Sequence, residues 1–319
     1  MAKGEKKGIK IIMVVAVSIL SIILVLWGGL NLLKFALYGD YYKAKESLCI
    51  NPGLNDGFIC QGICAYENSQ GDKFFVSGYM NDDSPSRIYV TNLQNESYYV
   101  NVKNPNDSHF YGHAGGIAVN GDFVYVASDD SINVINLADL LGASKGETVK
   151  IVEKIPVNNS ASFIFADSDY LYVGEFHNGK KYVTNHYYQS LEGDNYAIVS
   201  RYSYDNLSSP NKIYSIRNEV QGFCRLNNGK IVMSTSYGLA DSFYYVYDDA
   251  KAVDSGLVLD GAPVYFFDKP EKTIKGPAMA EGLDVYNNKV ITLTESASNK
   301  YVFGKFFFAN KIECLNLFD

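Results

Sequence analysis

Short runs in which apolar and polar residues alternate fill most of the chain after residue 50, and turn residues separate them. The run FVYVAS, residues 123–128, is typical, because Asn-Gly-Asp precedes it and Asp-Asp follows it. Such alternation predicts β-strands with one buried face, and the Gly, Asn and Asp between runs predict tight turns. A content of 26 Tyr and 18 Phe also favours sheets. The body of the chain is therefore predicted to be all-β.

One phrase of this pattern occurs in five copies. The clearest is HAGGIAVNGDFVYVAS, residues 113–128, in which a Gly-Gly turn leads into an apolar strand, a tight turn and an alternating strand. The copies recur roughly every 50 to 60 residues, a spacing typical of β-propeller blades. The other copies begin at Gln61, Ser162, Gln221 and Glu281. We expect a five-bladed β-propeller, and six blades fit if the insertion at residues 240–261 holds another.

Third and fourth strands follow the repeated phrase. In the fourth unit the run VYFFD from Val264 is expected to be the third strand. The fifth unit has no fourth strand before the chain stops at Asp319. We expect residues 46–50, ESLCI, to fill that place, because a strand from the other end would cover the raw sheet edge. A three-stranded last blade with a disordered segment before Asn51 is the alternative.

Residues 48–319 resemble the five- to six-bladed propellers of secreted and membrane-anchored bacterial proteins, including the lactonase-like ones. The phrases HAGGIAVNGDFVYVAS and EGLDVYNNKVITLTES carry the resemblance. It implies that the inner strands begin at one mouth of a central channel, so that the residues just before them converge. The resulting candidate ligand-binding residues are Gln61, His113, Gly115, Ser162, Gln221 and Glu281. Such polar side chains can bind a sugar or a polar peptide, or can simply bond to neighbouring blades and trapped water.

Candidate chemistry at this mouth is limited. His113 and Glu281 are the candidate catalytic residues, since each can act as a base. Asp284 and Glu295 are a second candidate pair, for glycoside hydrolysis. Lactonase-like propellers hold calcium with carboxylates and Asn, but the matching positions here offer one carboxylate, so we expect no cofactor, with calcium as the alternative. No zinc, nucleophile-elbow or phosphate-loop motif occurs, and the sequence leaves open whether the protein is an enzyme.

The N-terminal region has a different pattern. Residues 11–33 contain no charged side chain and are long enough to span a bilayer as a helix, with Lys-rich sequence before them. We expect a cytoplasmic tail at residues 1–10, a single transmembrane signal anchor at 11–33, a stalk at 34–47 and an extracytoplasmic propeller at 48–319. A cleaved signal peptide is the alternative, but its apolar core is normally shorter.

Charge and cysteine content limit the classes of binding partner and the possible disulfides. The net charge is −7 and the N-terminal segment is basic, so the body is strongly acidic and unsuited to nucleic acid. Bridges between Cys49 and Cys314 or between Cys49 and Cys60 are both compatible with the sequence, as is a set of reduced thiols. Cys64 and Cys224 are expected to be thiols in the core. The insertion at residues 177–194, which contains Tyr187 and Tyr188, is the best candidate recognition loop.

These observations favour a membrane-tethered extracytoplasmic β-propeller that acts as a binding module for a protein, peptide or glycan. An extracytoplasmic hydrolase or lyase, lactonase-like or a glycosidase, with its site at the channel mouth, is the alternative.

Overall fold

The computed structural model describes residues 3–301 and 309–318. The first two residues of the expected cytoplasmic tail, residues 302–308 and the last residue of the expected propeller lie outside this description. The chain forms two compact units, Met1–Lys43 and Ala44–Asp319, and each is described by itself.

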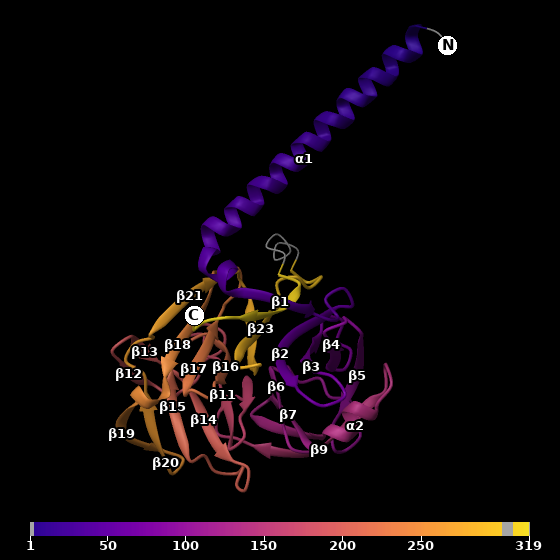
Figure 1. Cartoon of the computed structure of the whole chain (residues 1–319). Helices are drawn as coiled ribbons and strands as arrows, with labels where there is room; N and C mark the ends of the chain where they lie inside the picture. Colours follow the sequence, from indigo (N-terminus) through magenta and orange to yellow (C-terminus); the bar gives the residue numbers. More distant parts are fainter. Residues whose placement is uncertain (1–2, 302–308, 319) are drawn as a thin grey trace. The chain divides into compact units, whose positions relative to one another are not determined.

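The first unit is the helix α1 (Lys3–Ala44), drawn in indigo in Figure 1. Its segment Gly8–Ala44 is long and apolar enough to cross a membrane. Apolar side chains project around the helix, and Val25 and Leu32 are 74% and 75% exposed. A helix that is apolar all round and lies at the N-terminus suggests a membrane segment or a signal anchor. Tyr38 interrupts the helical backbone, with φ −131° and ψ 35°.

The second unit consists mainly of antiparallel strands. Among its described residues they form five runs of four. The first run is β2 (Phe58–Tyr66), β3 (Lys73–Met80), β4 (Arg87–Asn92) and β5 (Ser97–Lys103). The second is β6 (Gly116–Asn120), β7 (Phe123–Ser128), β8 (Ser131–Asn136) and β9 (Thr148–Pro156), with the short helix α2 (Leu137–Gly142) before β9. A parallel pairing of their last strands, β5 and β9, joins these first two runs. The third is β10 (Phe163–Ala166), β11 (Tyr170–Gly174), β14 (Ala197–Ser203) and β15 (Lys212–Ile216).

The remaining runs complete the set. The fourth is β16 (Val220–Arg225), β17 (Lys230–Thr235), β18 (Ser242–Asp248) and β21 (Lys272–Gly276). The fifth is β22 (Ala280–Tyr286), β23 (Lys289–Thr294), β24 (Lys311–Leu315) and β1 (Lys45–Ile50). Two hairpins are added: β12 (Tyr188–Ser190) with β13 (Gly193–Asn195), and β19 (Val253–Leu259) with β20 (Ala262–Phe266).

The expected closing strand is confirmed. β1 pairs antiparallel with β24, from Lys45 opposite Leu315 to Ile50 opposite Lys311. The carboxylate of Glu313 accepts hydrogen bonds from Lys45 Nζ at 2.6 Å and from Ser47 Oγ at 2.7 Å. The strand that follows α1 therefore completes the last run.

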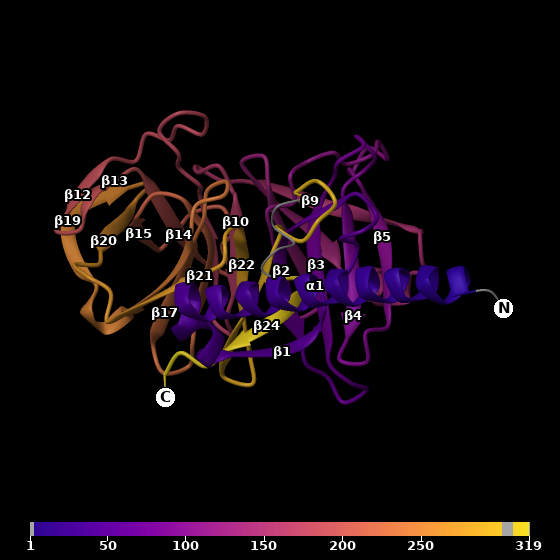
Figure 2. The same ribbon diagram turned by 90° about the horizontal axis from the view of Figure 1, so that it is seen from above.

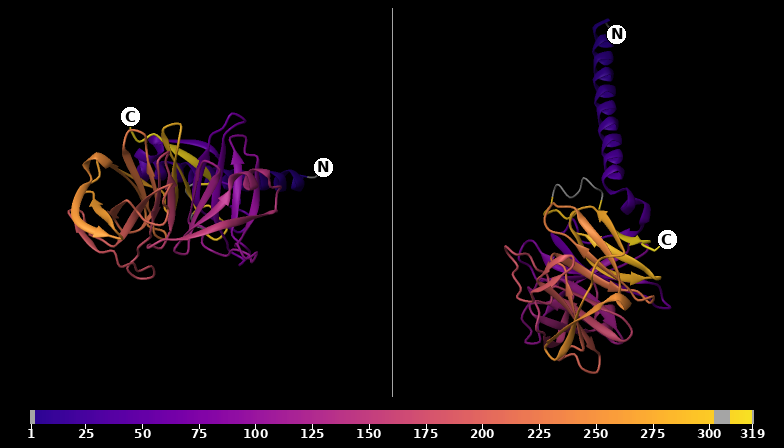
Figure 3. Two further views of the ribbon diagram at one scale, coloured as in Figure 1. Left: turned by 90° about the horizontal axis from the view of Figure 1, so that it is seen from below. Right: turned by 90° about the vertical axis from the view of Figure 1, so that its left-hand side faces the viewer.

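The expected third strand of the fourth run was wrong. That place is taken by β18, whose residues pair with both β17 and β21. The run at Val264 belongs to β20, which pairs in parallel with β15 and, with β19, extends the third run outward. Figures 2 and 3 show this orange hairpin at the outer edge of the β unit. The insertion at residues 240–261 thus supplies β18 and β19.

The first strands of the runs, which we call the inner strands, form a closed ring. β2 packs against β6, β6 against β10, β10 against β16, β16 against β22, and β22 against β2. Figure 2 shows β10, β22 and β2 side by side in the middle of the unit. Apolar clusters fill the space between neighbouring runs; one contains Phe75 and Val90 of the first run together with Val126 and Ile135 of the second. A ring of twisted sheets packed face to face is a β-propeller.

Glycines let the inner strands approach closely at the axis. A Cβ atom on Gly62 would lie 2.6 Å from Cα of Gly116, and one on Gly282 would lie 2.9 Å from Cα of Gly62. Because only glycine tolerates such backbone contact, the repeated glycine is required by the packing of the ring.

Candidate functional site

The ring has two ends. We call the end with the residues that precede or open the inner strands the leading face, and the end with the residues that close them the trailing face. The sequence-predicted residues Gln61, His113 and Glu281 lie at the leading face.

Three inner strands have the same irregularity in their first half. Gln61, Gln221 and Glu281 each sit at a β-bulge just before the axial glycine: the register shifts between Cys60 and Gly62, between Val220 and Gly222, and between Ala280 and Leu283. A bulge adds one residue to a strand and turns its side chain out of the alternating pattern. The pairs Gln-Gly, Gln-Gly and Glu-Gly therefore place polar groups at the leading face.

A chain of hydrogen bonds joins three polar side chains there. Gln61 Nε2 donates to Glu295 Oε2 at 3.0 Å and also to the carbonyl oxygen of Cys60. Since the carbonyl oxygen of Cys60 can only accept, it fixes the amide nitrogen of Gln61 on that side, and the amide oxygen faces His113 Nε2 at 2.8 Å. That oxygen can only accept, so His113 carries a proton on Nε2.

Two carboxyl groups share this environment. Glu281 is 2% exposed, and burial together with the nearby charge of Glu295 raises the pKa of Glu281 well above its ordinary value. Burial also raises the pKa of Glu295 to about 7, against the opposing effects of Lys300, the Tyr301 hydroxyl and Gln61. Neighbouring carboxyls that are shielded from water hold a proton near neutral pH, so the pair can donate as well as accept hydrogen bonds.

Aromatic and basic groups border the pair. The ring of His113 lies 4.5 Å from that of Tyr79, centroid to centroid, and Lys300 Nζ donates to the Tyr79 hydroxyl at 2.8 Å. Tyr79, Lys300 and Tyr301 were not predicted from the sequence. Tyr79 ends the first copy of the repeated phrase, in β3, whereas Lys300 and Tyr301 come from the segment after β23.

Other predicted site residues have structural partners. Ser162 Oγ bonds to Ser160 Oγ at 2.9 Å and accepts from the backbone N–H of Phe176 at 3.0 Å. Gly115 packs against Ser162, because a Cβ on Gly115 would overlap the carbonyl oxygen of that serine. Gln221 is half-buried at its bulge.

The trailing face holds a cavity of about 180 Å³. Every inner strand contributes to its lining, through Cys64, Ala118, Phe165, Arg225 and Asp284 among others. Burial raises the pKa of Asp284 to about 7, although its carboxylate accepts a 2.7 Å hydrogen bond from the N–H of Ala65. Asp284 and Glu295 are thus at opposite ends of the ring, and the expectation that they form one hydrolytic pair was wrong. Strand β22 runs from one face to the other and separates them.

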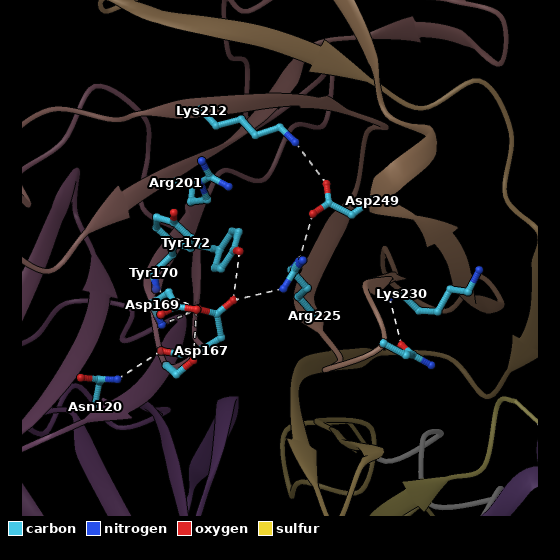
Figure 4. A network of polar contacts seen from close by, with 12 residues as sticks. Asn120, Asp167, Asp169, Tyr170, Tyr172, Arg201, Lys212, Arg225, Lys230 and Asp249 are labelled. Atoms are coloured by element: carbon cyan, nitrogen blue, oxygen red, sulfur yellow. Dashed lines mark hydrogen bonds and ion pairs between the residues drawn. The ribbon is translucent and has the colours of Figure 1, made fainter.

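An ion-pair network supports the trailing face (Figure 4). Arg225 lies between Asp249, with Nε to Oδ2 at 3.0 Å, and Asp167, with Nη1 to Oδ2 at 3.7 Å. Burial acts to raise the pKa of Asp249, but bonds from Tyr214, Lys212 and Arg225 hold it below its ordinary value. The network ties the end of β16 to the third run.

The candidate recognition loop, residues 177–194, is anchored at its base and exposed at its tip. His177 and Asn178 are buried, and Asn178 donates to Glu219 Oε1 at 2.7 Å. His186 Nδ1 pairs with the buried Glu175 at 2.5 Å, and this bond raises the pKa of His186. Tyr187 is 54% exposed, whereas the ring of Tyr188 packs against that of Phe266, with their centroids 4.9 Å apart.

All five cysteines are buried free thiols. Cys49 is paired in register with Ile312 and Cys314 with Glu46, so the two cysteines are not directly opposite. Within residues 3–301 and 309–318, no group of three or more His, Cys, Asp or Glu side chains is arranged to hold a metal ion.

Comparisons with known proteins find similarity in the fold but not in the sequence. No protein family and no curated protein matches its sequence. Among solved structures it is similar to a glutaminyl cyclase from Myxococcus xanthus, with a TM-score of 0.44, 9% identity, and coverage of 78% of this chain and 88% of that one. It is also similar to the PQQ-bound aldose sugar dehydrogenase of Streptomyces coelicolor, with a TM-score of 0.43, 14% identity, and coverage of 78% of this chain and 76% of that one. For the Pan2 WD40 domain of Neurospora crassa the TM-score is 0.38 and the identity 10%, with coverage of 79% of each chain. These likenesses carry no inference about activity.

Proposed function

We propose that the chain is a membrane-tethered, five-bladed, extracytoplasmic β-propeller that acts as a binding module for a protein, peptide or glycan through its leading face. The repeated bulge carries the proposal. Three separate strands depart from regular pairing at Gln61, Gln221 and Glu281. Bulges are over-represented at sheet edges and next to active sites, where they re-aim side chains.

The surroundings of the bulges support the same face. Burial lowers the pKa of His113, and the charge of Lys181 in the candidate recognition loop lowers it further. The ring of Tyr237, which follows β17 and is 40% exposed, lies 6.4 Å from that of Phe176, the residue before the loop, centroid to centroid. Buried hydrogen-bonding groups beside exposed aromatic rings suit a polar ligand of some length.

The test uses the full chain in lipid nanodiscs on arrays of glycans and of peptides. We expect the wild-type chain to bind members of one array. Tyr237→Ala should lose most of this binding, and Phe123→Ala should bind as the wild type does. Phe123 is the matched control because it is 41% exposed and opens β7 at the trailing end of its blade. Equal binding by the two variants would show that the leading face is not the binding surface. If no glycan or peptide binds, the proposal of a binding module is wrong.

The orientation has its own test. The Lys-rich sequence before residue 11 favours a cytoplasmic N-terminus, with the propeller on the other side of the membrane. Protease added to intact cells should degrade the propeller and leave an N-terminal tag protected. Protection of the propeller would reverse the orientation.

A hydrolase or lyase is the second candidate, and the adjacent carboxyls Glu281 and Glu295 favour it. A protonated Glu281 can donate to a leaving group while the other carboxylate assists water. Turnover of aryl glycosides or lactones that is lost in Glu281→Gln and His113→Ala, with circular dichroism unchanged, would support this candidate. Binding that survives both substitutions without any turnover would favour the binding module.

A further inference from the structure

A pocket of about 360 Å³ opens beside the recognition loop. Three segments of the leading face build it: the β12–β13 hairpin, the turn before β16, and the β17–β18 connection with the start of β18. We call it the side pocket. Its volume falls in the range of about 300–1,000 Å³ that is usual for small-molecule sites.

Aromatic rings form one wall of the side pocket. Phe243 and Tyr245 are on the same face of β18, with ring centroids 5.9 Å apart and planes inclined by 30°. Both are half-buried, and the exposed Tyr237 lies nearby in the lining. Fixed aromatic faces of this kind present an apolar platform against which the C–H groups of a ligand can pack.

The other walls offer both donors and acceptors. Asn218 Oδ1 accepts from the N–H of Tyr196 at 3.0 Å, and its amide group donates to the carbonyl oxygen of Asp194 at 3.3 Å. Asp194 and Glu219 each accept one side-chain hydrogen bond, from Tyr187 and Asn178 respectively. Because a carboxylate has about four lone-pair sites, both retain acceptor capacity toward a ligand.

Arg217 decides which ligand charge fits. Its guanidinium carbon lies 3.4 Å from the centroid of the Tyr245 ring, so the cation–π position over that ring is already filled. Four carboxylates line the pocket, and two of them have cationic partners: Glu192 lies 4.0 Å from Arg217 and Asp241 lies 3.2 Å from Lys275. Arg217 therefore opposes a basic ligand group at the Tyr245 ring, and the carboxylates of Asp194 and Glu219 oppose an anionic one. A neutral ligand with several hydroxyl groups meets an aromatic platform, acceptors and donors without either repulsion.

We propose that the side pocket binds one sugar ring of a neutral glycan, and that this glycan is the ligand of the leading face. The inference rests on the proposed binding function and names its ligand class. The ring packs its C–H face against Phe243, beside the Tyr245 ring that Arg217 covers, while its hydroxyl groups donate to Asp194 and Glu219 and accept from Asn218.

The test measures binding of neutral trisaccharides of glucose, galactose, mannose and N-acetylglucosamine to the full chain in nanodiscs by calorimetry. We expect at least one trisaccharide to bind, a loss of at least tenfold in affinity in Phe243→Ala, and less than a twofold change between 50 and 500 mM NaCl. Asp194→Asn, on an exposed hairpin, should weaken binding severalfold even if Phe243→Ala unfolds. Phe123→Ala should bind as the wild type does.

The failures are distinguishable. If no trisaccharide binds but peptides bind in a Tyr237-dependent way, the glycan inference is wrong and the binding module stands. Trisaccharide binding that is insensitive to both side-pocket variants, or that falls steeply with salt, would also overturn the inference. Failure of both the trisaccharides and the arrays would reject the binding module itself.

Discussion

Gln61 donates a hydrogen bond to Glu295 at 3.0 Å and so joins the first inner strand to the segment that follows β23. The amide oxygen of Gln61 also accepts a hydrogen bond from His113 Nε2 at 2.8 Å. The contacts that close the ring are therefore also the contacts that organise its polar mouth. A change at this point should affect stability and binding together.

The pH dependence of stability tests the buried carboxyls. Burial raises the pKa of Glu295 to about 7, whereas Glu in an unfolded chain titrates near about 4.3. The folded state holds the proton over that interval, so this group's contribution to the free energy of unfolding is full at low pH and falls as the pH rises from about 4.3 to about 7. In Glu295→Gln the contribution is absent, and the variant should gain on the wild type by up to about 1.4 kcal/mol per pH unit in that window.

Chemical denaturation in detergent at a series of pH values measures this difference. The exposed Glu153 provides the control, since Glu153→Gln should run parallel to the wild type. A constant offset between Glu295→Gln and the wild type over the whole window would show that Glu295 titrates normally.

The axial glycines predict a steric effect. In Gly62→Ala the new methyl group would lie 2.6 Å from Cα of Gly116 and 2.7 Å from the backbone nitrogen of Ile117, so the ring must open. We expect the free energy of unfolding to fall by about 1–3 kcal/mol or more. Gly142→Ala, with no atom within 4 Å of the new methyl group, should leave it unchanged or raise it. Equal effects of the two substitutions would argue against close packing at the axis.

Arg225 predicts a difference between half-buried and exposed ion pairs. Arg225→Met leaves Asp249 and Asp167 without this partner and should lower the free energy of unfolding by about 1–3 kcal/mol. Lys251→Met removes a lysine that is 70% exposed and paired with Glu271, and should cost about 0–1 kcal/mol. Denaturation midpoints of the two variants check the order, and a larger loss in Lys251→Met would contradict it.

Thiol labelling tests the cysteine assignment. Burial raises the pKa of Cys49 to about 12, and it also raises the pKa of Cys60, Cys64, Cys224 and Cys314. Because the thiolate is the reactive form, iodoacetamide at pH 8 should leave the native protein unlabelled and modify all five thiols after denaturation. Mass spectrometry counts the labels, and fewer than five after denaturation without reductant would reveal a disulfide.

The repeated phrase predicted much of the ring but not every strand partner. It gave the inner strands, because alternation and turn residues are local signals. The place of β1 followed from the missing fourth strand of the fifth unit, whose sheet edge needs a partner. It could not separate β18 from β20, since SFYYVYD and APVYF alternate equally well and the partner strand depends on packing. The sequence therefore could not show that the hairpin β19–β20 pairs with β15 of the third run.

The site was predictable where it coincided with the repeat. Gln61 and Glu281 precede an axial glycine, and that pairing signalled the leading face. Tyr79 and Lys300 carried no such signal, because β3 and the segment after β23 bring them there only in the folded ring. The residues that close the inner strands share no polar or charged residue type, because Arg225 and Asp284 have no counterpart in the other strands, so the cavity at the trailing face was invisible in the sequence.

Amide hydrogen exchange of the full chain in nanodiscs, with and without a saturating ligand from the arrays, measures which face of the ring binds that ligand. We expect new protection at the leading face, in residues 61–63, 113–116, 177–182 and 235–243. Protection confined to the trailing face, in residues 64–66, 118–120, 165–168 and 284–286, would contradict it.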